Sequence, residues 1–287
     1  MRVALVFPRL PRSVSPWVAL RVGHRAIPCS PVLGWRAMPT FVGLDLAWSS
    51  YRESGVCWLE GNSQSDLRCT RIEAAVLPTE KLANEIAAIQ GPVVVTVDAP
   101  LLYTPRRWAE REVARRFSRY KASPHQAHYA VRKGYTAGIE LGKALARRGF
   151  ILDPARCFEG DRDYRGVLEV FPHAVHVRLF GIPERLPYKP KRGRSVAFRR
   201  EVMQQYQSRL LTLVEEVAPR VLENADVCIA LHPDTPLRAK GASLKRLDDT
   251  LDGLTCAVAA WLLWSRFDEW ETIGDLNGYI LAPREQH

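Results

Sequence analysis

The sequence lacks long hydrophobic runs, cysteine motifs and repeats. No stretch of about 18 uncharged apolar residues occurs, so we expect no contact with a membrane, and the longest apolar run, at about 254–264, has the length of a buried helix. The six cysteines include no Cys-x-x-Cys pair, which excludes the usual zinc knuckle and redox motif and makes a cytoplasmic location the simplest prediction. Internal repeats and low-complexity tracts are also absent, which excludes a repeat protein.

The first 37 residues lack acids and lysine altogether, although they hold six arginines. Five prolines interrupt them, and they show no periodicity of a packed element. The composition resembles a transit peptide, but the prolines would break the amphipathic helix that such a peptide needs. We therefore expect residues 1–38 to be a poorly structured N-terminal extension. One hypothesis is that Met38 is the natural start and that the preceding residues are a mistaken upstream translation.

The net charge of +10 is unevenly distributed. Residues 1–37 contribute +6, residues 103–149 contribute +9 and residues 184–200 contribute +6, so the remainder of the chain carries −11. An acidic body with basic segments suits a polyanionic ligand that is held near a carboxylate site. Solvated helix faces would give the same charge pattern.

The order of the expected elements is that of an α/β domain. Three short strands at about 41–47, 54–60 and 68–74 form a predicted antiparallel meander, and a helix follows at 79–90. The β-branched run at 93–97 is typical of a strand buried on both faces. A basic helical segment, another strand at about 166–171, and helices at about 173–180, 195–217 and 247–267 come next, with a closing strand at 278–281. This predicts one domain over residues 39–287 with a helical insertion at about 103–165.

Acidic residues stand at positions where such a sheet builds a ligand site. Asp45 interrupts the apolar first strand, where an unpaired carboxylate is costly to bury. Asp98 follows the buried strand at its carboxyl end, and such ends line the ligand crevice of open α/β sheets. Glu169 lies on the later strand. Structural alternatives are an outward-facing or charge-paired Asp45, a turn-forming Asp98, and a Glu169 that pairs with an arginine.

A third group of acids lies on the last long helix, in the segment LDDTLDGLTCAVAAW. Helical spacing places Asp248 and Asp252, and also Asp249 and Asp252, on one face. Repulsion between these charges favours a bound cation, although an acid in a first turn also complements the helix dipole. Carboxylates gathered from distant positions can hold two divalent ions about 4 Å apart, which is the arrangement that phosphodiester cleavage uses.

Five segments occur in an order that resembles a known family: GLDLAWS (43–49), VTVDAPL (95–101), EVFPHA (169–174), YK (188–189) and DDTLDGLTCA (248–257). Together they resemble domain-of-unknown-function family 429, which is regarded as a family of predicted ribonuclease H-like nucleases. The resemblance covers nearly everything from Pro39 to the C-terminus. It implies a ribonuclease H-like mixed sheet, in which three antiparallel strands are followed by parallel strands, flanked by helices, and metal-dependent phosphodiester cleavage by analogy of fold.

Carried over to this sequence, the resemblance matches the family's acids to Asp45, Asp98, Glu169, Asp249 and Asp252. The helix motif departs from the expected pattern at Gly253, because glycine costs about 1 kcal/mol relative to alanine within a helix. That departure puts the placement of Asp252 in question.

The function predicted from these features is a nuclease that depends on Mg²⁺ or Mn²⁺ and acts on DNA or RNA. The predicted catalytic residues are Asp45, Asp98, Glu169 and Asp252, and the predicted metal ligands are Asp45, Asp98, Asp249 and Asp252. Contacts with nucleic acid are predicted for Arg107, Arg111, Arg115, Lys189 and Arg192. Aromatic residues of the same basic segment that could stack on bases are Trp108, Phe117 and Tyr120. In the alternative, the arginines pair with the acidic body and the aromatic side chains pack inward.

Two other functions stay open. One is a nucleic-acid-binding protein without hydrolysis, which would show salt-dependent binding but no turnover. The other is an actin-like phosphotransferase that uses ATP, although GLDLAWSS lacks the glycine-rich phosphate turn of such proteins and no second copy of the unit follows. Histidine pairs at 125/128 and 173/176 have spacing that a metal could use, but no third ligand stands out. His173 could instead serve as an acid or base.

Overall fold

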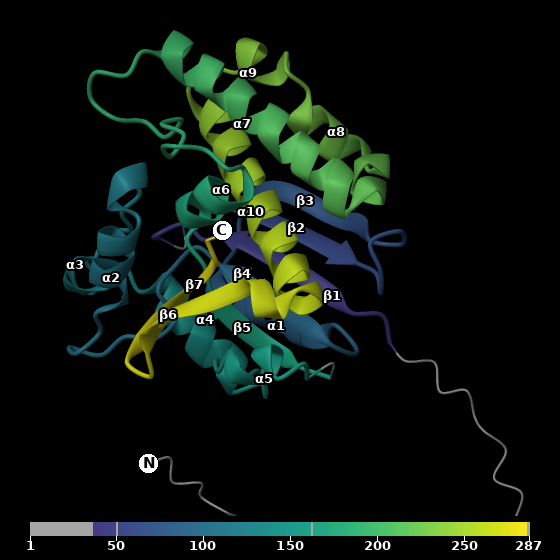
Figure 1. The fold of residues 1–287 in the computed structure, drawn as a ribbon, viewed down its shortest axis with the longest axis vertical. Coiled ribbons are helices and arrows are strands. Elements are labelled where there is room, and N and C mark those ends of the chain that lie inside the picture. The colour runs from purple at the N-terminus through teal and green to yellow at the C-terminus, as the bar shows by residue number, and fades with distance from the viewer. Residues whose placement is uncertain (1–36, 50, 162, 286–287) are drawn as a thin grey trace, which may run out of the picture. The chain divides into compact units, whose positions relative to one another are not determined.

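The computed structural model describes residues 37–49, 51–161 and 163–285 (Figure 1). Most of the predicted N-terminal extension, residues 1–36, lies outside the described residues, and so do the residues that the hypothesis of a start at Met38 concerns. The described residues from Ala37 onward belong to one compact unit by their own contacts. No helix within the described residues is long and apolar enough to cross a membrane.

A five-stranded mixed sheet forms the centre of this unit. Its strands are β1 (Thr40–Asp45), β2 (Glu53–Glu60), β3 (Arg68–Val76), β4 (Val93–Val97) and β5 (Arg165–Glu169), in the spatial order β3-β2-β1-β4-β5. β1, β2 and β3 pair antiparallel, whereas β4 runs parallel to β1 and β5 runs parallel to β4. This confirms the predicted mixed sheet with three antiparallel strands followed by parallel ones.

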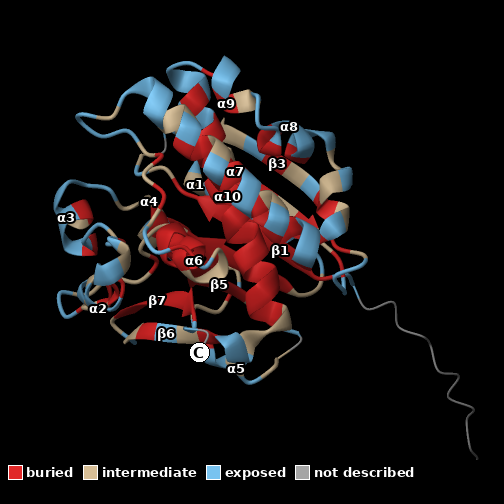
Figure 2. Ribbon diagram, turned by 45° about the horizontal axis from the view of Figure 1, so that its top comes forward, coloured by how far each residue is buried: buried red, intermediate tan, exposed pale blue. Residues whose placement is uncertain are grey.

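Helices pack on both faces of the sheet. Helices α1 (Thr79–Ala88) and α4 (Ala137–Ala146) share one core cluster with Val42 and Leu44 of β1. Helices α6 (Pro172–Leu179) and α10 (Ala242–Ser265) share the other core cluster with Phe41. Because side chains alternate along a strand, the odd-numbered positions of β1 face α10 and the even-numbered ones face α1 and α4. Figure 2 shows that α10 is buried along most of its length.

The remaining elements lie in the connections after β4 and after α6, and after α10. Between β4 and β5 lie α2 (Ala109–Arg116), η1 (Ser118–Tyr120), α3 (Ala127–Arg132), α4 and α5 (Ala155–Phe158). Between α6 and α10 lie α7 (Val196–Val217), η2 (Pro219–Glu223), α8 (Ala225–Leu231) and α9 (Thr235–Arg238). After α10 come η3 (Phe267–Glu269) and the antiparallel hairpin of β6 (Trp270–Asp275) and β7 (Gly278–Pro283). The pattern around 278–281 predicted β7, but β6 was not predicted.

Glycines bring the backbone of α10 against the sheet. A Cβ on Gly43 of β1 would lie 2.0 Å from the amide nitrogen of Ala257, and a Cβ on Gly55 of β2 would lie 1.7 Å from the carbonyl oxygen of Asp249. Gly253 faces the same contact, with its Cβ position 2.8 Å from the carbonyl carbon of Gly55. The helix therefore gives up about 1 kcal/mol of propensity at Gly253, and the close packing fixes the position of the neighbouring aspartates.

The helix also begins earlier than its sequence pattern indicated. α10 starts at Ala242, whereas we expected a start near residue 247. Asp248 and Asp249 therefore lie beyond the first turn, and a role in capping the helix N-terminus does not apply to them.

Candidate active site

Asp45 and Asp98 lie next to each other at the ends of neighbouring parallel strands. The register of β1 and β4 pairs Leu44 with Val97, so Asp45 and Asp98 are the next pair along, and the Asp98 amide donates a hydrogen bond to the Leu44 carbonyl at 2.8 Å. Such strands lie about 4.8 Å apart. Asp98 is two positions after Thr96, whose hydroxyl donates to the Cys256 carbonyl of α10 at 2.6 Å. By strand alternation, both aspartates point toward α10.

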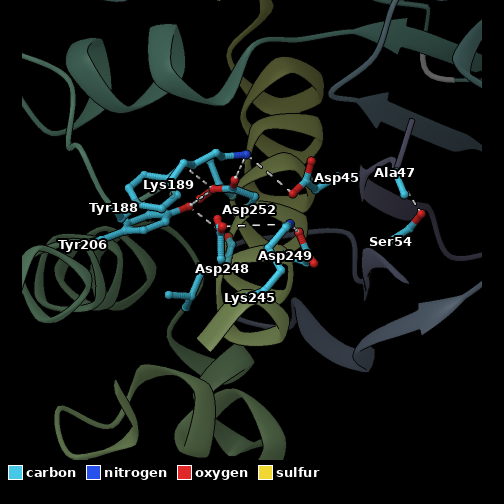
Figure 3. A network of polar contacts seen from close by, with 12 residues as sticks. Asp45, Ala47, Ser54, Tyr188, Lys189, Tyr206, Lys245, Asp248, Asp249 and Asp252 are labelled. Carbon is cyan, nitrogen blue, oxygen red and sulfur yellow. Dashed lines mark hydrogen bonds and ion pairs between the residues drawn. The ribbon is translucent and has the colours of Figure 1, made fainter. Parts of the chain in front are cut away.

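Three further aspartates approach from the helix. Asp248, Asp249 and Asp252 of α10 are 0%, 3% and 0% exposed, and Asp45 is 8% exposed. Figure 3 shows the Asp45 carboxylate opposite Asp249 and Asp252. We refer to these four residues together with Asp98 as the aspartate cluster. The structure thus brings together the end of the first strand, Asp98 after β4 and the late helix.

Two lysines and two tyrosines contact the cluster. The Lys189 ammonium lies 2.7 Å from Asp252 Oδ2 and 3.8 Å from Asp45 Oδ2. Lys245 forms an ion pair with Asp249, and its ammonium is 3.9 Å from Asp248 Oδ2.

The hydroxyls of Tyr188 and Tyr206 donate hydrogen bonds to Asp252 Oδ1 at 2.7 and 3.0 Å (Figure 3). Five carboxylates thus face two ammonium groups, and Asp252 is the most fully bonded of the five.

Burial and mutual repulsion make most of these carboxylates poor acids. Burial raises the pKa of Asp45, raises that of Asp248 to about 8, and together with the Asp45 charge raises that of Asp249 to about 7. The pKa of Asp98 lies well above its ordinary value for the same two reasons. Asp252 differs: burial alone would raise its pKa, but the Lys189 ammonium and neighbouring groups lower it to about 2. The site therefore holds more carboxyl groups than its two ammonium groups can keep ionised.

Asp248 is the clearest sign of this excess. Both of its carboxylate oxygens are buried and neither has a hydrogen-bond partner among the described residues. A carboxylate in this position needs a proton or a cation, because an isolated buried charge is costly. Carboxylate oxygens are also the donors that Mg²⁺ and Mn²⁺ prefer, so the donor set fits such an ion.

The positions of these donors, in contrast to their chemistry, are not those of a metal site. Within the part of the chain that the structure describes, no three Asp, Glu, His or Cys side chains are grouped as they would be around a metal ion. The Lys189 ammonium lies between Asp45 and Asp252, in the space that an ion shared by these two carboxylates would need. Binding of a cation there requires Lys189 to withdraw.

Glu169 is not brought into the aspartate cluster. On β5 it alternates onto the face of Val167, which packs with α1 and α4 rather than with α10. Its carboxylate accepts two hydrogen bonds from the Arg107 guanidinium, at 2.5 and 3.0 Å, and one from the Leu101 amide at 3.1 Å. The structure thus shows the alternative in which Glu169 pairs with an arginine.

Arg107 does not contact solvent, which corrects its prediction as a nucleic-acid-binding residue. Its side chain is 1% exposed and also donates to Glu110 at 2.7 Å and to the Leu102 carbonyl at 2.7 Å. A guanidinium with these partners is unavailable to a phosphate group. The sequence pattern around Arg107 could not reveal this, because Glu169, the second carboxylate partner of Arg107, is 62 positions away in the chain.

The other predicted basic contacts fall into two groups. Arg111 and Arg192 are exposed and form no ion pair among the described residues, so they can reach a ligand. Arg115 is exposed but bonded to Glu112 at 2.6 and 2.9 Å. Lys189 is held by the aspartate cluster, as described above.

Trp108, Phe117 and Tyr120, the three aromatic residues predicted to stack on bases, do not form a stacking surface. Phe117 is fully buried in the core, which corrects its prediction as a base-stacking residue. Trp108 is half-buried and its indole N–H donates to Asp275 at 3.0 Å, and Tyr120 packs against the core. These side chains follow the inward-packing alternative.

The histidine pair at 173 and 176 lies beside the tyrosines, away from any metal-like grouping. Both residues are buried, and burial lowers the pKa of His173 well below its usual value and that of His176 to about 4. His176 Nε2 shares a hydrogen bond with the Tyr206 hydroxyl at 2.9 Å. Both imidazoles are therefore neutral near pH 7.

Sequence reasoning missed two residues of the site. Lys245 precedes Asp248 and Asp249 by three and four positions, a helical spacing that was visible in the sequence. Tyr206 lies on the buried side of α7 between Val202 and Leu210, and nothing in the pattern of that helix distinguishes it from a packing residue.

The sheet order and the buried acidic site define a ribonuclease H-like α/β protein. The chain belongs to the family described as "Protein of unknown function (DUF429)", whose model matches residues 43–269. That range contains the entire aspartate cluster.

The chain matches no curated protein. It is similar to a crystal structure of the yeast mitochondrial Holliday junction resolvase, with 10% identity over 80% of this chain and 79% of that chain and a TM-score of 0.34. Similarity at this level carries no argument about activity, and the fold assignment rests on strand order and direction.

Proposed function

We propose that this chain is a divalent-metal-dependent nuclease, which hydrolyses phosphodiester bonds in DNA or RNA with Mg²⁺ or Mn²⁺. Asp45, Asp98, Asp249 and Asp252 are the proposed metal ligands. The observation that carries the proposal is the excess of buried carboxylates over ammonium groups, which leaves Asp248 without a hydrogen-bond partner among the described residues. A divalent cation compensates that charge better than a proton does near pH 7, because it can serve several carboxylates at once.

Tyrosine, lysine and glutamate side chains around the proposed ligands orient them or are placed to contact the substrate. Two divalent ions, when bound, activate water for attack and stabilise the leaving oxygen. Tyr188 and Tyr206 hold Asp252 in one orientation, as outer partners of metal ligands commonly do. Lys189, once released from Asp252, is placed to contact a phosphate. Glu169 contributes as a positioning residue, since it fixes the backbone of Leu101 in the loop that follows Asp98.

A nuclease assay with a panel of single-stranded DNA, duplex DNA and RNA tests the proposal. We expect cleavage with Mg²⁺ or Mn²⁺ that Asp45→Asn abolishes. The matched control is Asp226→Asn, which changes an exposed aspartate on α8 and should leave cleavage intact. Thermal unfolding provides a second readout, because added metal should stabilise the wild type and not Asp45→Asn. Unchanged cleavage in a folded Asp45→Asn protein would exclude the mechanism.

The position of Lys189 favours a second candidate, a nucleic-acid-binding protein without hydrolysis. In this reading Lys189 stays between Asp45 and Asp252 and no metal enters. Binding that weakens steeply with salt, without metal-dependent turnover or metal-dependent stabilisation, would support it. A cytoplasmic location stays a prediction from the cysteine pattern under either function.

A further inference from the structure

Three half-exposed aromatic rings form a cluster that the proposed chemistry does not use. Trp48, which follows β1, lies against His125 with ring centroids 4.9 Å apart and planes at 87°, and against Tyr135 at 5.0 Å and 57°. Trp48 is 40% exposed and Tyr135 is 39% exposed. The rings come from three separate segments of the chain and are held in place by one another.

This aromatic cluster lies beside the aspartate cluster. Trp48 follows Asp45 by three residues, a span of at most about 11 Å even in fully extended chain. Stacked nucleotides rise by about 3.4 Å each, so about three nucleotides cover that distance. The loop that begins at Lys189 supplies positive charge, because Lys191 and Arg192 are exposed and form no ion pair among the described residues.

These rings stay partly exposed although the fold buries other aromatic side chains of similar size. The largest fully buried side chains of the fold include Tyr164, Tyr188, Tyr206 and Phe41, so the core accommodates aromatic residues of this size. An aromatic face left in water next to an acidic site and exposed cations matches the requirements of nucleic-acid bases, which stack on such faces regardless of their sequence. In a duplex, both faces of a base are already stacked on its neighbours, so only an unpaired or flipped base offers a free face.

We propose that Trp48, Tyr135 and His125 form a base-stacking subsite for an unpaired nucleotide, so that the preferred ligand is single-stranded or locally unpaired nucleic acid. The proposal deepens the proposed function and rests on it only for the cleavage that follows binding. The subsite positions the strand so that a phosphate a few nucleotides away reaches the aspartate cluster.

The test measures binding separately from cleavage. Fluorescence anisotropy gives the Kd of labelled single-stranded and fully paired, blunt-ended duplex oligonucleotides for the full chain carrying Asp45→Asn, with and without Mg²⁺. We expect tighter binding of the single strand, and a loss of about 5- to 150-fold in Trp48→Ala, the range that corresponds to one lost stacking contact. Trp48→Phe keeps an aromatic face and should lose much less. Phe198→Ala removes an exposed ring on α7 outside the cluster and should leave both Kd values unchanged.

Several outcomes would overturn the subsite. They are equal affinity of the parent protein for both oligonucleotides, no binding at all, an unchanged single-strand Kd in Trp48→Ala, or an equal loss for both oligonucleotides. A change in oligomeric state with unchanged Kd would assign the rings to a protein contact instead. If Trp48→Ala does not fold, Tyr135→Ala tests the same surface. Single-strand binding that depends on Trp48, without Mg²⁺-dependent cleavage by the wild type, would remove the hydrolase proposal and keep the subsite.

Discussion

Replacing Glu169 by glutamine tests whether this buried carboxylate stabilises the fold or takes part in the chemistry. The side chains of Arg107 and Glu169 are 1% and 6% exposed, and two hydrogen bonds join them. Glutamine keeps the shape of the side chain but removes the charge that faces the guanidinium. We therefore expect Glu169→Gln to act mainly on stability, and only weakly on the aspartate cluster.

The size of the expected destabilisation follows from the burial of the Arg107–Glu169 ion pair. Breaking a buried ion pair by removing one partner costs about 3–5 kcal/mol, because the other charge is left uncompensated. Glu110 remains bonded to Arg107 at 2.7 Å, so we place Glu169→Gln at the lower end, about 3 kcal/mol. For a domain of this size that corresponds to a fall in Tm of about 6–12 °C. Arg107→Met leaves two carboxylates without their guanidinium and should cost about 5 kcal/mol.

Urea unfolding of both single variants and the double variant measures the coupling. We expect the double variant to be less destabilised than the sum of the single variants by at least about 2 kcal/mol. Glu112→Gln is the control, because its ion pairs with Arg115 and Arg116 lie at the surface and contribute little. A Glu169→Gln protein that keeps its stability but loses Mn²⁺ binding would refute the reasoning and return Glu169 to the metal site.

Three further predictions concern the packing and electrostatics of the site. Gly55→Ala places a Cβ 1.7 Å from the Asp249 carbonyl oxygen. Calorimetry should therefore show a loss of stability of at least about 1–3 kcal/mol, the usual cost of overpacking. An unchanged Tm would contradict the close packing of α10. Burial lowers the pKa of His176 to about 4 from an ordinary 6.5, so the unfolded chain binds more protons between these values and stability falls as the pH drops from 6.5 to 4, by on the order of 3 kcal/mol. Urea unfolding at both pH values should show a smaller fall in the free energy of unfolding for His176→Gln than for the wild type. An equal fall would mean that another group is responsible for the pH dependence. Lys189→Met removes the ammonium that competes with a cation for Asp252, so calorimetric titration should show Mg²⁺ affinity rising by about tenfold, whereas a weaker affinity would mean that Lys189 supports metal binding.

The local patterns of the sequence were sufficient for the sheet and for part of the site. Strong β-branched runs and period-two alternation gave the strands, and β4 has the bounds that its pattern indicated. Asp45 and Asp98 were recognisable because a carboxylate within a buried strand, or directly at its end, is costly to bury unless it is paired or binds a ligand. Helical spacing placed Asp252 and Asp249 on one face without any knowledge of the fold.

Only the tertiary structure decided which charges meet. Whether Glu169 faces α10 or the opposite layer depends on the register of β5, and its partner Arg107 comes from the segment just before α2, 62 positions away in the sequence. Lys189 enters the aspartate cluster from the loop after α6, and nothing local distinguishes it from a lysine that contacts solvent. The physical reason is that propensity and periodicity act over a few residues, whereas burial and ion pairing depend on packing between segments that are distant in the chain.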